Sequence, residues 1–484
     1  MIGIVKKQAK GRISPLKIHF FYDIVCNDKN DDEKIRKTKM KDLTKGYPAK
    51  VIMMFAIPLM FGYIFQQFYN MADSKIVSTY VGTDALAAVG ATAVVFNTMI
   101  FFVNGLTQGF SILIANSFGA KDMAGLRKNV AGTIVYTVVA TLIMTVAGLI
   151  FIVPILELLQ TPPEIMGAAT AYVKIVIAGM ATSSLYNMCA NALRAVGDSK
   201  NPLYCLMVAV VTNIVLDIIF VRDLKMGIEG AAYATVIAQA LAGILCLTII
   251  LVKFKEILPQ KGDWKFEKAR YRNLFTTGIS MALMGCIVNI GTIVLQGAIN
   301  ELGTDIVAAH TASRRVFDVM TVILYTVGIA MTTYASQNMG AGKPLRVRQG
   351  VRHANLIVTG FTTLLIVFCY VLGEPLLIWI TATGNRTIID ASVMYLELSV
   401  WFFYVLGPLF VMRCTLQGMG RKIIPLFSSL MEMIVKVLSA GFLVPAFAYV
   451  GVALTEPISW IVMIIPLIVA YFVKPPEKMI VSNE

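Results

Sequence analysis

The two halves of this chain are related by an internal repeat with an offset of 221 residues. The repeated positions are the Gly-Thr-Asp tripeptide at 82–84 and 303–305, Pro154 and Pro375, Gly119 and Gly340, and Gly230 and Gly451. A repeat that extends over a whole chain predicts two units of the same fold with the same order of elements.

The composition indicates that the repeated unit is a bundle of membrane helices. Hydrophobic residues make up 57% of the chain and charged residues 14%, and the mean hydropathy is +0.74. A soluble protein has about 45–50% apolar and about 25% charged residues. Apolar segments of about 20 residues recur, each long enough to cross roughly 30 Å of hydrocarbon. We therefore expect an all-α polytopic membrane protein with twelve transmembrane helices, in two six-helix bundles related by a pseudo-two-fold axis.

The predicted organisation follows from these segments. The spans are expected at 48–75, 87–116, 129–152, 168–192, 202–221, 228–252, 274–300, 306–337, 353–373, 390–416, 425–446 and 450–473. The parts are a cytoplasmic extension at 1–45, an N-terminal lobe at 46–252, a basic cytoplasmic linker at 253–273, a C-terminal lobe at 274–474 and a cytoplasmic tail at 475–484. The extension is too polar and acidic for a secretory signal. Residues 1–39 have no counterpart in the second half, and Met40 is an alternative start.

The net charge of +14 is explained by the membrane topology. Basic clusters occur at Lys121/Arg127/Lys128, Lys253 to Arg272, Lys343/Arg346/Arg348/Arg352 and Arg421/Lys422. These clusters occupy alternate loops, as the positive-inside bias requires, and place both termini in the cytoplasm. We expect a multi-pass plasma-membrane protein whose partner is the lipid bilayer and not nucleic acid. The seven cysteines form no CxxC pair and are predicted to be small core residues.

Polar residues in the first half predict a cation site. An ionised side chain at mid-membrane costs about 2.5–3.5 kcal/mol on insertion scales, so each needs an explanation. Asn213 and Asp217 are four residues apart and share a helix face. Topology places Thr235 and Asp73 in the same outer half of the lobe. Carboxylate, amide and hydroxyl oxygens suit Na⁺, or a proton held by a carboxylate. The alternative is that Asp73 caps a helix end in water and that Asp217 bonds neighbouring backbone.

Pro58 lies inside the first span, fifteen residues before Asp73. A proline within a helix removes a backbone hydrogen bond and produces a kink that can change its angle. Pro58 is therefore a candidate hinge, and a static bend is the equally favoured alternative.

The second half carries different charges. The repeat places Val294 opposite Asp73, and no carboxylate stands at 438–440, opposite Asp217. Glu432 and Lys436 are spaced for an ion pair, which is either structural or part of a substrate path. Arg413 is a further charge that is either structural or part of a cleft, and the remaining charges in or near these spans are Glu397, Asp318, Glu456, Arg314 and Arg315. We expect Arg314 and Arg315 to reach toward lipid headgroups from an outer boundary.

Motifs of enzymes are absent from the sequence. The stretch 340–344 imitates the end of a phosphate loop, but Gln337 stands in place of its first glycine and Pro344 replaces its Ser or Thr. No HExxH or GxSxG motif occurs. The chain is not expected to be an enzyme or to hydrolyse ATP.

The sequence resembles the multidrug and toxic compound extrusion (MATE) family from about Gly46 to Lys474. The marks are the Pro58 to Asp73 spacing, Gly-Thr-Asp-Ala-Leu-Ala-Ala at 82–88, Ser-Phe-Gly-Ala at 117–120, Leu-Arg-Ala-Val-Gly-Asp at 193–198, Asn213-x-x-x-Asp217, Gly-Ala-Ala at 230–232, and Thr235. One branch of the family has a glutamate midway along the seventh helix. This chain has Val288-Asn289 there, so it is more similar to the DinF-like or MepA-like branches than to NorM.

The resemblance implies two lobes around a central cleft. It also implies export of varied, often cationic and aromatic drugs in exchange for Na⁺ or H⁺. Asp73, Asn213, Asp217 and Thr235 would form the cation site. No cofactor beyond the coupling ion and no obligatory protein partner is implied. A flippase for a lipid-linked oligosaccharide is the alternative within the same superfamily, and it would need a strongly cationic cavity. An intramembrane enzyme is the alternative from another class.

Overall fold

The structure is a computed structural model that describes residues 40–158, 161–381 and 385–481. The predicted extension at 1–39, which contains Cys26, lies outside the described residues. Every regular element in the described part of the chain is helical.

The helices are long and closely follow the predicted spans. The first half contains α2 (Pro48–Tyr80), α3 (Thr83–Gly119), α4 (Met123–Leu158), α5 (Pro163–Ala178), α6 (Met180–Ala195), α7 (Lys200–Asp217), the π-helix η1 (Ile218–Asp223) and α8 (Gly227–Lys253). The second half contains α9 (Lys268–Asn300), α10 (Thr304–Gly340), α11 (Pro344–Thr381), α12 (Arg386–Trp401), α13 (Phe403–Gly418), α14 (Ile423–Leu438), the π-helix η4 (Ser439–Leu443), α15 (Val444–Val473) and the short α16 (Pro476–Val481).

The number of spans depends on how three bent segments are counted. Within the described residues, nine segments are long and apolar enough to cross a membrane. The pairs α5/α6 and α12/α13, bent by 44° and 54°, add one span each. The segment Ile423–Val473 has 51 residues, or about 75 Å of helix, far more than a bilayer needs. Ala448 breaks this segment with a φ of 48°, so the chain turns back there and makes two spans. The described chain thus has the predicted twelve.

The repeat is visible in the backbone as well as in the sequence. Gly82 and Gly303, with φ of 113° and 96°, precede α3 and α10. Gly227 and Ala448 both have a positive φ, of 62° and 48°. The π-helices η1 and η4 begin 221 residues apart. Alanine is strained at positive φ, so the second half retains this turn even where the glycine has been replaced.

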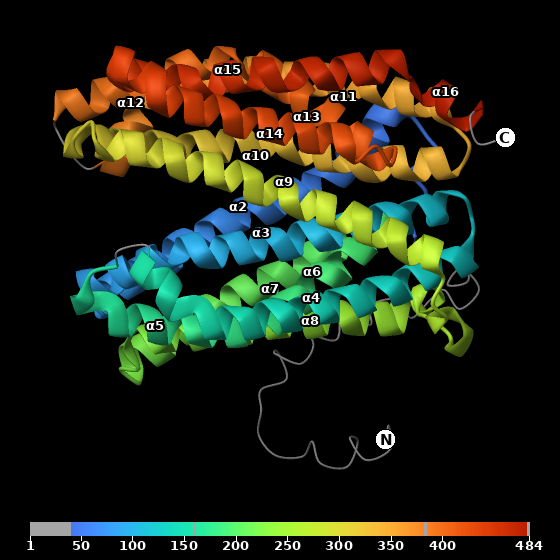
Figure 1. Ribbon diagram of the computed structural model, residues 1–484, viewed down its shortest axis with the longest axis horizontal. Helices are drawn as coiled ribbons and strands as arrows, with labels where there is room; N and C mark the ends of the chain where they lie inside the picture. Colours follow the sequence, from blue (N-terminus) through green and yellow to red (C-terminus); the bar gives the residue numbers. More distant parts are fainter. Residues whose placement is uncertain (1–39, 159–160, 382–384, 482–484) are drawn as a thin grey trace, which may run out of the picture.

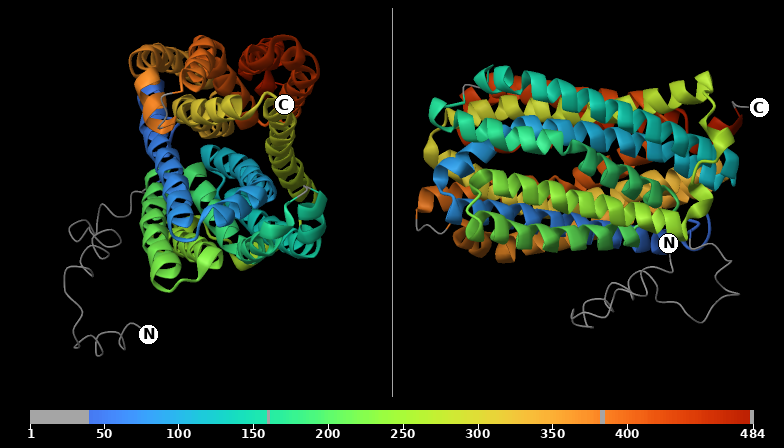
Figure 2. Two further views of the ribbon diagram at one scale, coloured as in Figure 1. Left: turned by 90° about the vertical axis from the view of Figure 1, so that its left-hand side faces the viewer. Right: turned by 90° about the horizontal axis from the view of Figure 1, so that it is seen from below.

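The two halves form two layers of helices that lie side by side (Figure 1). The view along the helices shows α2 crossing between the layers on one side and α9 on the other (Figure 2). Helix α2 packs on α7 in its own half and on α10 and α11 in the other. Helix α9 correspondingly packs on α14 and on α3. Both crossing helices therefore connect the two lobes, in equivalent positions of the repeat.

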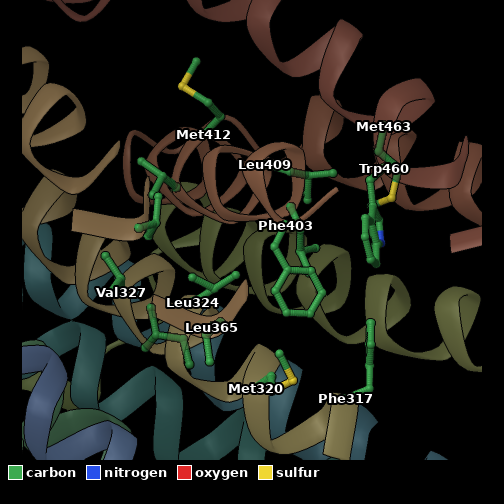
Figure 3. Packing of buried hydrophobic residues seen from close by; sticks show 14 of the residues in the cluster. Phe317, Met320, Leu324, Val327, Leu365, Phe403, Leu409, Met412, Trp460 and Met463 are labelled. Atoms are coloured by element: carbon green, nitrogen blue, oxygen red, sulfur yellow. The ribbon is translucent and has the colours of Figure 1, made fainter. Parts of the chain in front are cut away.

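The C-terminal lobe has a continuous core. Its centre is a group of aromatic rings in which Phe317 lies 5.5 Å from Phe403 and 6.0 Å from Trp460, between ring centroids. Met and Leu side chains fill the space around these rings (Figure 3). Buried apolar residues of the N-terminal lobe instead fall mainly into two separate groups. One surrounds the ends of α6 and α8 near the basic loops, and the other lies at the opposite end of the lobe. Packing of this kind stabilises membrane bundles mainly through dispersion.

The lobes are joined tightly at one end, which we name the basic end because the basic segments 120–128, 253–273, 341–352 and 419–422, which include the starts of α4, α9 and α11, lie there. A Cβ at Gly119 would lie 1.9 Å from the carbonyl oxygen of Gln337. A Cβ at Gly340 would lie 2.0 Å from the carbonyl oxygen of Asn116. These two contacts are equivalent under the repeat. Only glycine permits such close approach of two helix backbones.

Gln337 adds a polar connection at the basic end. Its side chain is fully buried. Its Nε2 donates to the carbonyl of Ala195 at 2.8 Å, and its Oε1 accepts from the backbone N–H of Leu43 at 3.0 Å. A further bond joins Ser336 Oγ to the carbonyl of Ile112 at 2.6 Å. Residue 337 of the C-terminal lobe therefore holds both the start of the described chain and the end of α6.

The linker between the lobes is fixed against α4. Arg127 Nε lies 2.9 Å from Asp263 Oδ2, and Lys128 Nζ lies 2.5 Å from Glu267 Oε1. A hydrogen bond from the backbone N–H of Gln260, together with the Arg127 guanidinium, holds the pKa of Asp263 below its usual range. The carboxylates of the linker thus neutralise basic residues at the start of α4.

Candidate cation site and substrate cleft

The four residues of the predicted cation site come together from three helices. Helix α7 supplies Asn213 and Asp217, both fully buried. With the amide oriented by its hydrogen-bond network, Asn213 donates to Asp217 Oδ2 at 2.8 Å and accepts from the backbone N–H of Thr235 at 3.2 Å. Helix α8 supplies Thr235, and α2 supplies Asp73. The i,i+4 spacing on α7 therefore places an amide and a carboxyl group in one pocket.

Asp73 and Asp217, which we name the carboxyl pair, lie close enough to hydrogen-bond to each other once one of them carries a proton. The Oδ1 atom of each is buried and has no partner. Two carboxylates in contact repel each other unless a proton or another cation lies between them. The pair is thus arranged to hold one positive charge, with the Asn213 amide and the Thr235 hydroxyl beside it.

The structure contradicts the two alternative roles of Asp73 and Asp217, a helix cap and a bond to neighbouring backbone. Asp73 does not cap a helix end, because α2 continues from Asp73 to Tyr80. Asp217 does not bond only to backbone, because its Oδ2 accepts from the Asn213 amide. Asp217 lies about 26 Å along α7 from Lys200, and Thr235 about 12 Å along α8 from Gly227.

Two tyrosines complete the pocket and were not predicted. The hydroxyl of Tyr69 lies 3.3 Å from Thr235 Oγ1. Tyr172 of α5 lies close enough to both members of the carboxyl pair for electrostatic interaction. Tyr69 precedes Asp73 by four residues, so its place on the same face of α2 could have been read from the sequence. No spacing in the sequence indicates that Tyr172 lies in this pocket.

A cleft of about 730 Å³ adjoins this pocket. It is lined by Pro58, Leu59, Gly62, Tyr63, Gln66, Gln67, Tyr69, Asp73, Val89, Thr92, Ala93, Phe96, Asn97, Ile100, Phe101, Asn104, Tyr172, Ser183, Tyr186, Asn187, Arg194, Ser199, Leu203, Leu206, Thr235, Gln239, Asp318 and Val322. Only Asp318 and Val322 come from the C-terminal half. Asp73 and Thr235 face the cleft, whereas Asn213 and Asp217 lie behind them. The lining of aromatic rings and amides suits flat organic molecules of drug size.

Pro58 lies inside α2 and on the wall of the cleft. Helix α2 therefore carries Pro58, faces the cleft and bears Asp73. The hinge role of Pro58 stays a prediction.

Charged side chains of the C-terminal lobe form ion pairs with one another. Lys436 Nζ lies 2.9 Å from Glu432 Oε1 and 3.4 Å from Glu456 Oε1. Arg314 lies 3.4 Å from Glu456 and 3.0 Å from Asp318. We name these five residues the C-lobe charge network. Glu432 and Lys436 form a buried ion pair, and neither lines the cleft.

Two arginines of this lobe, Arg314 and Arg413, bond to side chains of the protein. The expectation that Arg314 reaches toward headgroups is wrong, because two carboxylates hold it inside the bundle and its guanidinium lies 4.6 Å from the centre of the Phe317 ring. Arg413 donates to Ser429 Oγ at 2.6 Å and does not line the cleft.

The donor set at the carboxyl pair suits a proton or Na⁺ better than a transition metal. Within the described residues, no group of three or more His, Cys, Asp or Glu side chains could hold a metal ion. The six described cysteines are free thiols, five of them buried, as expected for small core residues.

A duplicated bundle of twelve spans, with a cleft beside a buried carboxyl pair, defines a membrane transporter. The MatE family model matches residues 58–219 and again residues 280–443, one match in each half. The chain belongs to this family, whose members are transporters and not enzymes.

Relatives and solved structures agree with this membership. The chain is 29% identical to the probable multidrug resistance protein YoeA of Bacillus subtilis, over 77% of this chain and 81% of the relative. It is 26% identical to YpnP of the same species, over 80% and 86%. A crystal structure of MATE in complex with MaL6 has a TM-score of 0.83 at 22% identity, over 89% of this chain and 97% of that chain. MepA of Staphylococcus haemolyticus, at 21% identity over 77% and 83%, is compatible with the expected branch.

Proposed function

We propose that this protein is a secondary active multidrug efflux transporter of the plasma membrane. It exports cationic and aromatic compounds in exchange for Na⁺ or H⁺. The observation that carries the proposal is the carboxyl pair, since a charge-binding pocket beside a drug-sized cleft links ion entry to drug release. The names of YoeA, YpnP and MepA, all multidrug resistance or export proteins, support the class of substrate.

The proposed orientation places the basic end in the cytoplasm, following the positive-inside bias. Both termini are then cytoplasmic. Because the lobes are joined at the basic end by Gln337 and by Gly119 and Gly340, this conformation is closed to the cytoplasm. Asp73 lies about 37 Å along α2 from Pro48 and therefore near the outer side.

In the proposed cycle, a cation arriving from outside binds at the carboxyl pair and removes the repulsion between Asp73 and Asp217. Helix α2 carries Asp73 and also packs on α10 and α11 of the other lobe, so a change of bend at Pro58 would move the wall of the cleft. The cleft then narrows and the drug leaves. Drug and cation thus shift the same conformational equilibrium of α2 in opposite directions.

The energy available is sufficient for drug export. One cation entering gains about 2.3 kcal/mol per 100 mV and about 1.4 kcal/mol for each tenfold concentration gradient. The sum of ~3.7 kcal/mol supports roughly 500-fold accumulation of a neutral compound in one-to-one exchange. Export of a cationic drug returns the voltage contribution and lowers this limit.

The flippase alternative is not favoured. A carrier of a lipid-linked oligosaccharide must bind a pyrophosphate, which needs several cationic side chains. Among the described residues that line the cleft, Arg194 is the one Lys or Arg side chain.

The test is ethidium efflux from a drug-sensitive host that expresses Asp73→Asn or Asp217→Asn. Each substitution removes one of the two charges that hold the cation, so efflux should fall to the level of cells without the protein, with unchanged amounts of protein in the membrane. Glu164→Gln, which changes an exposed acid in the first turn of α5, is the matched control and should retain full efflux. Normal efflux by both Asn variants would exclude the carboxyl pair from the mechanism.

The coupling ion is identified in everted vesicles. Efflux that persists with a pH gradient in the absence of Na⁺ assigns the proton. Efflux that requires a Na⁺ gradient at constant pH assigns Na⁺.

A further inference from the structure

Arg194 is the one Lys or Arg side chain among the described residues that line the cleft, and the proposed function does not use it. It lies in the last turn of α6. One donor, Nη1, bonds to Asn191 Oδ1 at 3.0 Å. Its Nε is buried without a partner. A guanidinium has five N–H donors and stays charged inside a protein, so one neutral acceptor leaves most of its bonding capacity unused.

No carboxylate within the described residues forms an ion pair with Arg194. The acid nearest in sequence, Asp198, is occupied by the side chain of Asn201 and by the backbone N–H of Lys200. Arg314 and Lys436, the cations of the C-lobe charge network, each have two carboxylate partners. Arg194 therefore differs from them in having no counter-ion, which is costly for a charge away from water.

Arg194 is held in place by a second layer of hydrogen bonds. Asn191, whose oxygen accepts from Arg194, donates through Nδ2 to Thr107 Oγ1 at 2.9 Å. Asn191 and Thr107 are both buried. A guanidinium that is oriented in advance at a cavity wall loses little entropy when it binds a planar anion in two-pronged fashion.

The surroundings of Arg194 are electropositive and aromatic. Tyr325 of α10 lies within electrostatic range of both Arg194 and Arg413. The rings of Tyr63 and Tyr325 are 5.8 Å apart, edge to face, across the boundary between the lobes. Tyrosine hydroxyls are neutral donors that also bond to anions. The residues around this guanidinium thus offer donors and ring faces but no negative charge of their own.

Arg194 and the carboxyl pair lie at different depths in the same cleft. Arg194 is one residue before Ala195, whose carbonyl is bound by Gln337 at the basic end. Tyr63, which lies within electrostatic range of Arg194, precedes Asp73 by ten residues on α2, or about 15 Å. The cleft therefore has a positive end beside the closed basic end and a negative end beside the carboxyl pair.

We propose that Arg194 is an anion-binding subsite that recognises a carboxylate or phosphate group of the exported compound. The inference rests on the proposed export function and defines its substrates further: aromatic compounds with an acidic group bind in preference to matched compounds without one. Flat rings lie between the tyrosines and amides, and the acid points to the basic end. A compound that also carries an amine directs it toward Asp73.

The test uses a matched pair of fluorescent probes, dansylglycine and dansylglycinamide, which differ only in a carboxylate and its neutral amide. Binding is measured by dansyl fluorescence with the purified full-length protein in detergent. A hydrogen-bonded ion pair predicts that wild type binds dansylglycine about tenfold more tightly. Arg194→Gln should make the two affinities equal, and Arg194→Lys should keep part of the preference. Asn187→Ala, a neutral change in the cleft wall, should weaken both probes alike.

Three outcomes overturn the proposal. The first is that wild type binds dansylglycine and dansylglycinamide equally well, a result that needs no variant and so does not depend on the folding of Arg194→Gln. The second is that Arg194→Gln still prefers dansylglycine. Displacement of dansylglycine by equimolar phosphatidylglycerol would assign the subsite to a lipid headgroup; an unchanged binding curve supports the exported compound. Failure of the proposed function looks different, because ethidium efflux would then persist in Asp73→Asn whatever the ratio of probe affinities.

Discussion

In the N-terminal lobe two buried carboxyl groups face each other, whereas in the C-terminal lobe each buried carboxylate faces a cation. Asp217 has the Asn213 amide as a partner, and Asp73 and Asp217 lie against each other. Glu432 and Glu456 have Lys436, and Glu456 also has Arg314. The first arrangement is incomplete without an added positive charge, and in the second every carboxylate of the charge network already has a cationic partner. Ion binding is therefore expected in one lobe only.

The two lobes also differ in how their interiors are packed. Nearly the whole lining of the cleft comes from the first half, and the apolar core there is divided. The second half is packed continuously around Phe317, Phe403 and Trp460. Duplication has kept the backbone, including the π-helices η1 and η4, while the chemistry has diverged. A π-helix that follows Asp217 in one lobe and Leu438 in the other is a property of the fold, not a mark of the ion site.

The largest effect is expected where the lobes are equivalent. Gly119→Ala and Gly340→Ala each force a methyl group against a backbone carbonyl of the other lobe, at 1.9 and 2.0 Å. Helix backbones cannot yield as side chains do, so closure at the basic end should fail and ethidium efflux should be abolished by either change. Gly90→Ala in α3, where a Cβ meets no atom within 4 Å, is the control and should retain efflux. A defect in only one of the two variants would break the equivalence.

The next effect separates the lobes. Lys436→Met leaves Glu432 without a cationic partner and Glu456 with Arg314 alone, and should destabilise the protein by about 3–5 kcal/mol, seen as a lower thermal unfolding midpoint in detergent. Asp217→Asn removes a repulsive charge and should leave the midpoint unchanged or raise it, although efflux is lost. A midpoint that falls in both variants to the same extent would contradict the comparison.

A double variant refines this result. Glu432→Gln combined with Lys436→Met removes a charge of each sign and should recover part of the lost stability. Arg386→Gln, at an exposed ion pair with Glu374 on the surface, should leave the midpoint unchanged and serves as the control.

The smallest effect concerns the polar contact at the basic end. Gln337→Ala leaves the N–H of Leu43 and the carbonyl of Ala195 without their shared partner, a loss of about 1–3 kcal/mol. Hydrogen–deuterium exchange at residues 41–46 should become about tenfold faster. Gln349→Ala, an exposed glutamine on α11, should not change it. Unaltered exchange in Gln337→Ala would show that the Gln337 carboxamide is not needed to hold residues 41–46 at the basic end.

The span pattern and the repeat were predictable because helix length and hydrophobicity are local properties of the sequence. The meeting of Asp73 with Asp217 was predictable too, because topology and helical rise fix depth in a bilayer. The contact of Arg314 with Asp318 follows from their i,i+4 spacing on α10, but the contact with Glu456 was not predictable, since it depends on how α10 rotates against α15. The close approach of Gly119 to Gln337 was equally inaccessible, because backbone-to-backbone contact leaves no periodicity in a sequence.

The bond between Leu43 and Gln337 joins positions 294 residues apart. A ribosome adding 5–20 residues per second needs ~15–60 s to travel from one to the other. During that interval the first helices are already in the membrane, but the Gln337 carboxamide that accepts from the N–H of Leu43 has not yet been synthesised. Locking of the cytoplasmic face is therefore among the last events of biogenesis, and a nascent chain stalled before α10 would remain unsealed.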